Sequence, residues 1–421
     1  MPVTPLTGIS ARGFTVIPES SKAAVSRELA IVNGEAILPN QIVSNAMVHL
    51  VGHTIVYVGP VKRLPKRVEQ IDAGGGYISP GFVDIHVHGG HGADFMDGTA
   101  NAVETSLKAH RQHGTTTIVP TSTTGPFEHL MAMIDACRVV QKNAGKNRIG
   151  SMIAGVHLYG PYFAEDKTGC HSKDGCRPLE SDEFRKYFET KMIRVATCAA
   201  ELSGAKEFYA MARRRKCLIT CGHSNASWNE MQQAFDAGVR HVDHFWCAMS
   251  SVPSVRQRSG VPMQGSMAEF VLMNRDMSTE VIADGCHLAP ELLEFAYRMI
   301  GPDRLCLVTD CNRAMDQPPG TYQFGHAKSG TAFRSDGHVG WAANGSLASS
   351  IRGMDFMVRH MKSVTTAALP EIIRMASLTP ATRIGLGHVT GSLSAGKRAD
   401  ILILDRNLHV VGSFARGESW N

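Results

Sequence analysis

Short apolar runs alternate with helix-like segments through the middle of the chain, from about residue 78 to residue 386. Eight of these runs are typical of buried strands, and they begin at residues 77, 115, 151, 192, 216, 239, 279 and 303. The segments between them have helical spacing, as in residues 101–114, where Gly114 is placed to end the helix. This order predicts an α/β fold, a (β/α)₈ TIM barrel whose active site lies where the strands end.

The two ends of the chain follow another pattern. In residues 28–77 and again in residues 387–421, short apolar stretches are separated by glycine turns, as in β-hairpins. Two such segments on either side of a long middle predict one small β-sandwich domain formed by both termini, with residues 78–386 as the barrel domain. Residues 1–27 lack periodicity and are interpreted as an N-terminal extension.

Composition and charge argue against several classes of protein. The net charge of +5 is small and the basic residues are scattered, so no nucleic-acid partner is expected. No apolar run has the length of a signal peptide or a membrane span, so we expect a cytoplasmic protein with no membrane partner. The 10 cysteines are spread through strand-like runs, which predicts reduced thiols rather than a disulfide framework.

Histidines and acidic residues stand at the ends of the predicted strands. His86 and His88 end the first strand, and the period of two along a strand places both imidazoles on one face. His223 ends the fifth strand and Asp310 the eighth. Three histidines and a carboxylate with room for water form the open coordination that hydrolytic zinc sites use. These residues therefore predict a metal site at the barrel mouth.

The predicted site has a simple hydrolytic chemistry. A bound divalent ion lowers the pKa of water to about 7, which makes hydroxide available at neutral pH. Asp310 is expected to take the proton as general base and to pass it to the leaving group as general acid. Zinc is the first candidate for the ion, and iron and manganese are the others.

Several longer motifs carry a family resemblance. They are PGFVDIHVHGG (80–90), HLYGPYF (157–163), GHSNA (222–226), HFWCAM (244–249), ADGCHLAPE (283–291), LVTD (307–310), PPGTYQFG (318–325) and the terminal GSLSAGKRADILILD. From about residue 28 to its end, the chain resembles the N-acetylglucosamine-6-phosphate deacetylases of the amidohydrolase superfamily. The resemblance implies a distorted barrel with a small β-sandwich, a homodimer, and removal of an acetyl group from an amino sugar phosphate, a small carbohydrate substrate.

One departure from the family lies at the metal site. The resemblance gives His223 and His244 as metal ligands and Asp310 as the catalytic aspartate, but Tyr159 replaces the family's glutamate ligand. A neutral phenol is a poor ligand for a hard divalent ion. We therefore expect the ion to lie toward His86, His88, His223 and Asp310, with His244 touching the hydroxide.

The resemblance also implies which residues bind the substrate. His171 matches a loop histidine that helps to polarise the amide carbonyl, and His287 matches one that contacts the phosphate-bearing end. Cys247 stands where the family usually has asparagine, but the backbone N–H groups of Cys247 and Ala248 are still expected to bind an anion. Arg256 is the best counterpart of an arginine that reaches the phosphate across the dimer, and Arg258 is the second choice.

Two other interpretations stay open. Tyr159 and Cys247 favour a related metal-dependent hydrolase of a sugar lactone, cyclic amide or amidine. The missing glutamate also allows a catalytically silent homologue with a structural or regulatory role. His171, His287 and an arginine after the sixth strand favour the first hypothesis, a metal-dependent deacetylase of an N-acetyl amino sugar 6-phosphate.

Overall fold

The computed structural model describes residues 27–144 and 150–420. The extension predicted for residues 1–27 lies outside this part of the chain, except for Arg27. Arg27 is exposed and pairs with Glu69 at 2.9 Å. None of the helices in the described ranges has the length and hydrophobicity needed to cross a lipid bilayer. All ten cysteines fall within these ranges and are unpaired, as the sequence predicted.

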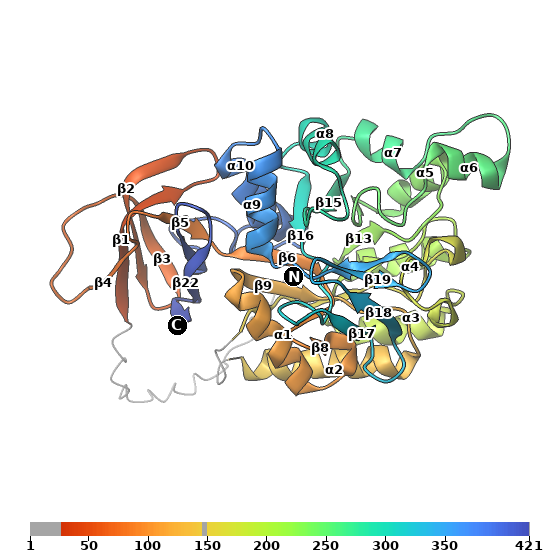
Figure 1. The fold of residues 1–421 in the computed structure, drawn as a ribbon, viewed down its shortest axis with the longest axis horizontal. Helices are drawn as coiled ribbons and strands as arrows, with labels where there is room; N and C mark the ends of the chain where they lie inside the picture. Colours follow the sequence, from red (N-terminus) through yellow and green to blue (C-terminus); the bar gives the residue numbers. More distant parts are fainter. Residues whose placement is uncertain (1–26, 145–149, 421) are drawn as a thin grey trace, which may run out of the picture.

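Strands from both ends of the chain share one eight-stranded sheet (Figure 1). Antiparallel pairing of β21 with β5, in which Ile403 lies opposite Ile78, joins the C-terminal strands to the N-terminal ones. Buried aliphatic side chains such as Ile31, Val48 and Ile401 form a core of their own on this sheet. Its strands are β1 (Glu28–Ile37), β2 (Ile42–Val51), β3 (Thr54–Pro60), β4 (Glu69–Asp72), β5 (Tyr77–Pro80), β21 (Ile401–Leu404), β22 (Val410–Ala415) and β23 (Glu418–Trp420).

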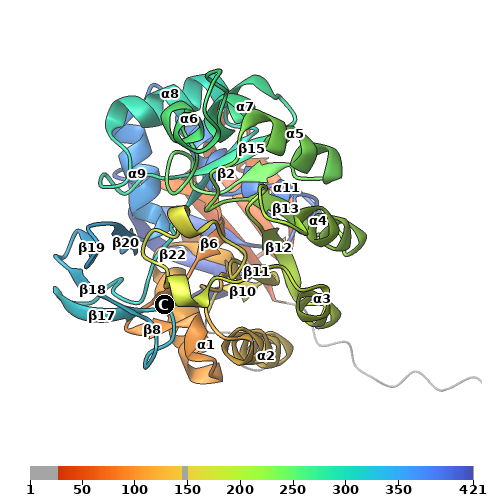
Figure 2. The same cartoon turned by 90° about the vertical axis from the view of Figure 1, so that its right-hand side faces the viewer.

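A curled parallel sheet occupies the middle of the molecule (Figure 2). It has a three-stranded section, β10-β9-β6, and a six-stranded section that runs from β11 to β16 in chain order. Thr121 bridges to His157 between the two sections, and on the other side the Asp310 N–H donates to the His86 carbonyl at 2.9 Å. The strands are β6 (Phe82–Val87), β9 (Thr115–Pro120), β10 (Met152–Ile153), β11 (Val156–Leu158), β12 (Ile193–Thr197), β13 (Leu218–Cys221), β14 (His241–Val242), β15 (Ser278–Ile282) and β16 (Leu305–Val308).

Each of the eight predicted runs contains an observed strand, but two of the runs are divided. The first run forms β5, which joins the terminal sheet, and β6, which joins the parallel sheet, with Gly81 between them. A Cβ atom on Gly81 would lie 2.1 Å from Thr116 Oγ1, so only glycine fits this close approach. The third run divides into β10 and β11 at Ala154 and Gly155, and Gly155 has a φ of 144°.

Helices connect the parallel strands and pack around the outside of the curled sheet (Figure 2). The helix predicted over residues 101–114 is α1, which ends at Gln112, and Gly114 follows with a φ of 84° as predicted. The helices are α1 (Ala100–Gln112), α2 (Phe127–Asn143), α3 (Ser181–Glu189), α4 (Ala205–Arg214), α5 (Trp228–Ala237), α6 (Val252–Ser259), α7 (Met267–Met273), α8 (Pro290–Ile300), α9 (Met354–Val364), α10 (Leu369–Ala376) and α11 (Leu378–Arg383).

A four-stranded antiparallel sheet is inserted between β16 and α9, and the sequence analysis did not predict it. Its strands are β17 (Gly320–Phe324), β18 (Thr331–Ser335), β19 (Val339–Ala342) and β20 (Leu347–Ser350). The insert lies against the C-terminal ends of the parallel strands. The Asn312 N–H, just after β16, donates to the carbonyl of Ser350 in β20 at 2.9 Å. The insert therefore forms one wall of the region where the polar strand ends meet.

Candidate metal centre

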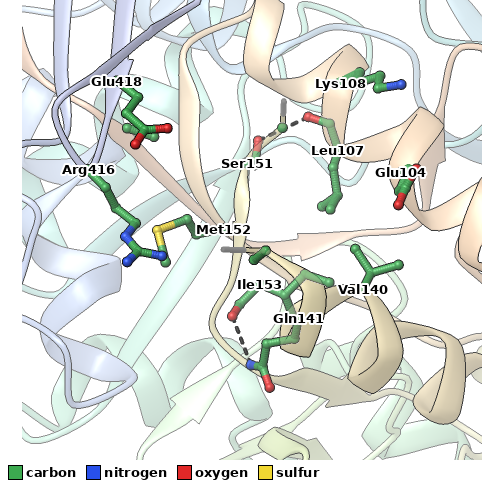
Figure 3. A pocket seen from close by; sticks show the side chains of 13 residues that line it. Glu104, Leu107, Lys108, Val140, Gln141, Ser151, Met152, Ile153, Arg416 and Glu418 are labelled. Carbon is green, nitrogen blue, oxygen red and sulfur yellow. Dashed lines mark hydrogen bonds between the residues drawn. The ribbon is translucent and has the colours of Figure 1, made fainter. Parts of the chain in front are cut away.

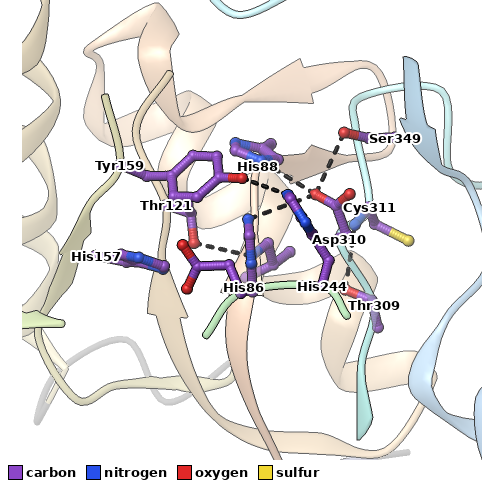
Figure 4. Close-up of polar contacts among 12 residues, drawn as sticks. His86, His88, Thr121, His157, Tyr159, His244, Thr309, Asp310, Cys311 and Ser349 are labelled. Carbon is purple, nitrogen blue, oxygen red and sulfur yellow. Dashed lines mark hydrogen bonds and ion pairs between the residues drawn. The ribbon is translucent and has the colours of Figure 1, made fainter. Parts of the chain in front are cut away.

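The C-terminal ends of the parallel strands surround one cavity of about 380 Å³. Parallel strands bring their C-terminal ends to the same edge, so polar residues that are far apart in the sequence meet there. Most of the residues predicted for the site line this cavity: His88, His171, His223, His244, Cys247, Ala248, His287 and Asp310. His86 lies beneath them, fully buried, with its ring 5.5 Å from that of His88 (Figure 4).

Three of these residues can hold a metal ion together. The ligand atoms of His86, His88 and Asp310 all lie within 4.8 Å of one another. Asp310 Oδ1 is 3.2 Å from His88 Nε2 and 3.7 Å from His86 Nε2. Among the described residues, His86 Nε2 and His88 Nδ1 are buried and have no hydrogen-bond partner. Because such groups are costly to bury unpaired, the donor set fits a divalent cation bound at this position.

Glu280 lies next to this three-residue group and was not among the residues predicted from the sequence. It stands in the middle of β15, where one carboxylate oxygen contacts His86 Nδ1 and accepts the His244 N–H at 3.1 Å. The signal in the sequence is a single acidic residue inside a strand that is otherwise buried and uncharged. A carboxylate on Nδ1 fixes a histidine ring so that Nε2 faces the metal. Glu280 therefore orients His86.

The charges in this cluster stabilise one another. Burial disfavours the charged form of His86, but Glu280 and Asp310 outweigh burial and raise its pKa to about 9. Burial alone would raise the pKa of Asp310, but the hydrogen bond from His88 and the nearby His86 hold it well below its usual range. Asp310 is therefore a carboxylate at neutral pH, which is the form that binds a cation or accepts a proton.

Tyr159 lies among the histidines with its side chain fully buried. Its ring centroid is 4.4 Å from that of His86 and 5.2 Å from that of His223. The phenol oxygen contacts His244 Nε2 at 2.5 Å (Figure 4). His244 Nδ1 lies 3.0 Å from the Cys247 carbonyl. Both ring nitrogens of His244 are therefore engaged by the protein, and the tyrosine hydroxyl stands where a further ligand would have to lie.

His223 lies at the cavity but outside the three-residue group. Its Nδ1 donates to the Lys167 carbonyl, 2.5 Å away, and its ring stacks on Phe163 with centroids 4.2 Å apart. Phe163 is a second residue that the sequence analysis missed. The backbone at His223 has a φ of 46°, which turns the chain sharply at the end of β13. Because Nδ1 is used by the Lys167 carbonyl, Nε2 is the nitrogen available to a ligand.

The histidines expected to bind substrate line the same cavity. His171 Nδ1 accepts the Thr124 N–H at 3.4 Å, so a neutral His171 carries its proton on Nε2. His287 Nδ1 lies 2.8 Å from Asp284 Oδ2. Burial disfavours the charged His287 ring, but Asp284 outweighs burial and raises its pKa. The cavity is thus lined by a neutral donor, His171, and by His287, whose charged form Asp284 favours.

The remaining predicted substrate residues differ in their placement. The Cys247 N–H donates to the His244 carbonyl at 2.8 Å, so it is already used within the turn. The Ala248 N–H has no such bond within the described part of the chain. Arg256 is exposed on α6 and is not part of this chain's cavity wall. Arg258, the second choice, pairs with Glu230 on α5. Helix α6 projects from the molecule at the upper right of Figure 1.

A separate hollow of about 50 Å³ lies between α1, α2, β10 and the β22–β23 hairpin (Figure 3). Its wall is mostly made of apolar side chains such as Leu107, Val140 and Met152. The charged residues at its rim, Glu104, Lys108 and Arg416, do not converge on one point in the way the strand-end residues do. The candidate chemistry is therefore concentrated in the cavity at the strand ends.

Comparison with known proteins assigns this fold to a family. Residues 77–418 match the model of the amidohydrolase family. The chain is 30% identical over 363 residues to N-acetylgalactosamine-6-phosphate deacetylase of Escherichia coli O157:H7, covering 86% of this chain and 92% of that protein. It is 27% identical over 396 residues to N-acetylglucosamine-6-phosphate deacetylase of Bacillus subtilis, covering 93% and 97% of the two chains.

Solved structures agree with this assignment at the level of the fold. N-acetylglucosamine-6-phosphate deacetylase of Pasteurella multocida has a TM-score of 0.85 at 24% identity, covering 93% of this chain and 99% of that one. The Mycobacterium smegmatis enzyme of the same name has a TM-score of 0.83 at 25% identity, covering 94% and 100%. The chain therefore belongs to the amidohydrolase family and, within it, to the N-acetylglucosamine-6-phosphate deacetylase family, as its motifs indicated.

Proposed function

We propose that the protein is a metal-dependent hydrolase that removes the acetyl group from an N-acetyl amino sugar 6-phosphate, with N-acetylglucosamine 6-phosphate as the first candidate substrate. The observation that carries this proposal is the convergence of His86, His88 and Asp310 at the floor of a substrate-sized cavity. The named relatives, two of them deacetylases of different amino sugar phosphates, support this class of substrate.

A divalent ion would be held by His86 Nε2, by a ring nitrogen of His88 and by Asp310, with His223 as a further ligand from the cavity wall. Zinc is the first candidate, and iron and manganese are the others. When bound, a divalent ion polarises the amide carbonyl and lowers the pKa of a water molecule to about 7. Two imidazoles, one of them oriented by the Glu280 carboxylate, and the Asp310 carboxylate are a donor set that suits such an ion.

Tyr159 supports this placement of the ion. The family position on the third, fifth and sixth strands would require a carboxylate at residue 159 and a free Nε2 on His244. Here residue 159 is a phenol, and its hydroxyl contacts that nitrogen. His244, whose two ring nitrogens are both engaged by the protein, therefore lies beside the three-residue group without serving as a ligand.

Asp310 moves the proton in this reaction. As a carboxylate it takes a proton from the attacking water, and it then donates that proton to the nitrogen of the departing amine. His171 donates a hydrogen bond from Nε2 to the amide oxygen as negative charge develops there. The products are acetate and the free amino sugar phosphate.

The phosphate end of the substrate is bound at the outer part of the cavity. His287, whose ring contacts Asp284, and the Ala248 N–H beside Cys247 contact the phosphate. Arg256 reaches the phosphate from the partner subunit of a homodimer, since it lies outside its own chain's cavity. We propose that the enzyme acts on this small carbohydrate in the cytoplasm.

The same proposal includes the finer architecture. The curled parallel sheet closes into a distorted (β/α)₈ barrel that spans residues 78–386, supported by the backbone hydrogen bond from Asp310 to His86. Residues 28–77 and 387–421 form the small β-sandwich domain, supported by the pairing of β21 with β5.

A second candidate is hydrolysis of a sugar lactone, cyclic amide or amidine, which Tyr159 and Cys247 favour because both change the family's site. One screen separates the two. Metal-loaded protein is offered N-acetylglucosamine 6-phosphate, N-acetylgalactosamine 6-phosphate, their unphosphorylated forms and sugar lactones. We expect acetate release that is fastest with an acetylated 6-phosphate. Hydrolysis of a lactone alone would support the second candidate, and inactivity on every compound with the ion bound would support a silent homologue.

A further inference from the structure

Ser349 occupies an unfavourable backbone conformation in the cavity wall. It is the third residue of β20, it is 6% exposed, and its φ is +59°. In this left-handed region a side chain with a Cβ atom is strained, and glycine is the residue that fits without cost. Strained residues are retained mainly at functional sites. The conformation therefore prompts the question of what the serine hydroxyl contributes.

The hydroxyl of Ser349 contacts the carboxylate proposed to act in catalysis. Ser349 Oγ donates to Asp310 Oδ1 at 3.2 Å (Figure 4). Asp310 Oδ1 also lies 3.2 Å from His88 Nε2 and 3.7 Å from His86 Nε2. Asp310 Oδ2 has no partner among the residues that the structure describes. The two oxygens of Asp310 are thus distinguished by their surroundings.

The backbone around Ser349 is fixed to the strand end that carries Asp310. The Ser350 N–H donates to the Asp310 carbonyl at 3.0 Å, and the Asn312 N–H donates to the Ser350 carbonyl at 2.9 Å. Asp310 itself has a φ of 47°. Two residues in left-handed conformations are therefore held against each other by paired backbone bonds, which leaves the serine hydroxyl little freedom to move away from the carboxylate.

We propose that Ser349 is a positioning residue for Asp310. Its hydroxyl holds Oδ1 toward His86 and His88, and this leaves Oδ2 as the oxygen that takes the proton from water and returns it to the amine. The inference rests on the proposed function, because it takes Asp310 as both ligand and proton carrier. It assigns to the inserted sheet a direct part in the site, since Ser349 comes from β20.

Two variants separate positioning from a structural role. Ser349→Gly removes both the hydroxyl and the backbone strain, and Ser349→Ala removes the hydroxyl alone. Lys191→Gly is the matched control, because exposed Lys191 has the same φ of +59° far from the cavity. For each protein we would measure Co²⁺ affinity by chelator competition, the visible absorption of bound Co²⁺, the melting temperature, and kcat and KM for the acetylated sugar phosphate.

We expect both Ser349 variants to bind Co²⁺ about 10-fold more weakly and to show an altered cobalt spectrum. Their kcat should be about 10-fold to 100-fold lower, because this is the usual effect of losing a residue that orients a metal ligand. KM should stay within about twofold of wild type. Ser349→Gly should melt no lower than wild type, and Lys191→Gly should change neither Co²⁺ affinity nor kcat.

Wild-type Co²⁺ affinity and spectrum in both Ser349 variants would overturn the proposal, as would a loss of kcat that follows only from a lowered melting temperature. A wild-type protein that binds no Co²⁺ would instead overturn the proposed metal centre itself. The affinity measurement uses no substrate, so the two failures are distinguishable.

Discussion

Single residues decide which atoms of the site remain available to a ligand. Glu280 engages His86 Nδ1, the Lys167 carbonyl engages His223 Nδ1, and Tyr159 engages His244 Nε2. In His86 and His223 the contact occupies Nδ1 and leaves Nε2 for a ligand, whereas in His244 the phenol occupies Nε2. The site is therefore set up before any ion or substrate enters it, with His86 Nε2 and the Asp310 carboxylate directed to one point.

Replacing Asp310 with asparagine tests its role in proton transfer. Asp310→Asn keeps the size of the side chain but removes the group that accepts a proton, so we expect kcat to fall by about 10²-fold to 10⁴-fold. The histidines should still hold an ion, which metal analysis of the purified variant would check. Turnover close to that of wild type would contradict the assigned role.

Tyr159→Glu tests whether the phenol limits the number of ions. A carboxylate at residue 159 would lie near His223 and His244 and would complete a second set of ligands. We expect wild type and the control Tyr159→Phe to bind one ion per chain, and Tyr159→Glu to bind two, as measured by elemental analysis after gel filtration. Two ions in wild type, or one in Tyr159→Glu, would show that Tyr159 does not control the count.

The site residues that stand at strand ends were predictable from the sequence, because a histidine or aspartate after a buried run is visible without any knowledge of the fold. His88, His223, His244 and Asp310 are of this kind. Glu280 and Ser349 were not found, since their importance comes from a contact with a residue far away in the chain. Which ring nitrogen of each histidine is left for a ligand also depends on such contacts.

At the level of elements, α1 and α9 are joined by a partly buried charged cluster on the outside of the parallel sheet. His113, at the end of α1, contacts Asp355 of α9 at 2.9 Å and Asp316 at 3.0 Å. Burial favours the neutral ring, but the two carboxylates outweigh it and raise the pKa of His113 to about 10. The protonated ring therefore stabilises the folded state through the contact between the two helices.

This cluster predicts a pH dependence of stability. The raised pKa means that the contribution of His113 is present in full below about pH 6.5, its unfolded value, and is lost as the pH rises through about 10. We expect His113→Gln to melt below wild type, with the largest difference in melting temperature near pH 6 and a smaller difference at pH 10. A difference that stays constant or grows with pH would contradict this assignment. Arg359→Gln, on α9 beside Asp355, is a control that keeps the histidine.

The hydrophobic pattern predicted the parallel strands because they are buried on both faces and form continuous apolar runs. It did not show where the first and third runs divide, because Gly81 and Gly155 break the strands through close packing against Thr116 and Arg194. Strands β17 to β20 were not predicted, since they have only four or five residues each and several of these are exposed. Such short runs resemble loops until their partners are known.

At the scale of the whole molecule, the proposed homodimer can be tested by mixing variant subunits, because Arg256 is exposed on α6. If Arg256 serves the partner's cavity, a mixture of Arg256→Ala and Asp310→Asn subunits contains dimers with one complete site. We expect each variant alone to be impaired on the phosphorylated substrate, and refolded mixtures to recover activity, with about half the activity of wild type in each mixed dimer. Mixtures no more active than the separate variants would place Arg256 outside the partner's site. Sedimentation would check the dimer itself.

At this scale too, we propose that an ion bound by His86, His88 and Asp310 drives removal of an acetyl group from an amino sugar 6-phosphate. The most direct measurement is a titration of zinc into chelator-stripped protein while acetate release from N-acetylglucosamine 6-phosphate is followed. We predict no release from the stripped protein, a linear rise with added zinc, and saturation at about one ion per chain. Release that is unaffected by stripping, or none at full zinc occupancy, would contradict the claim.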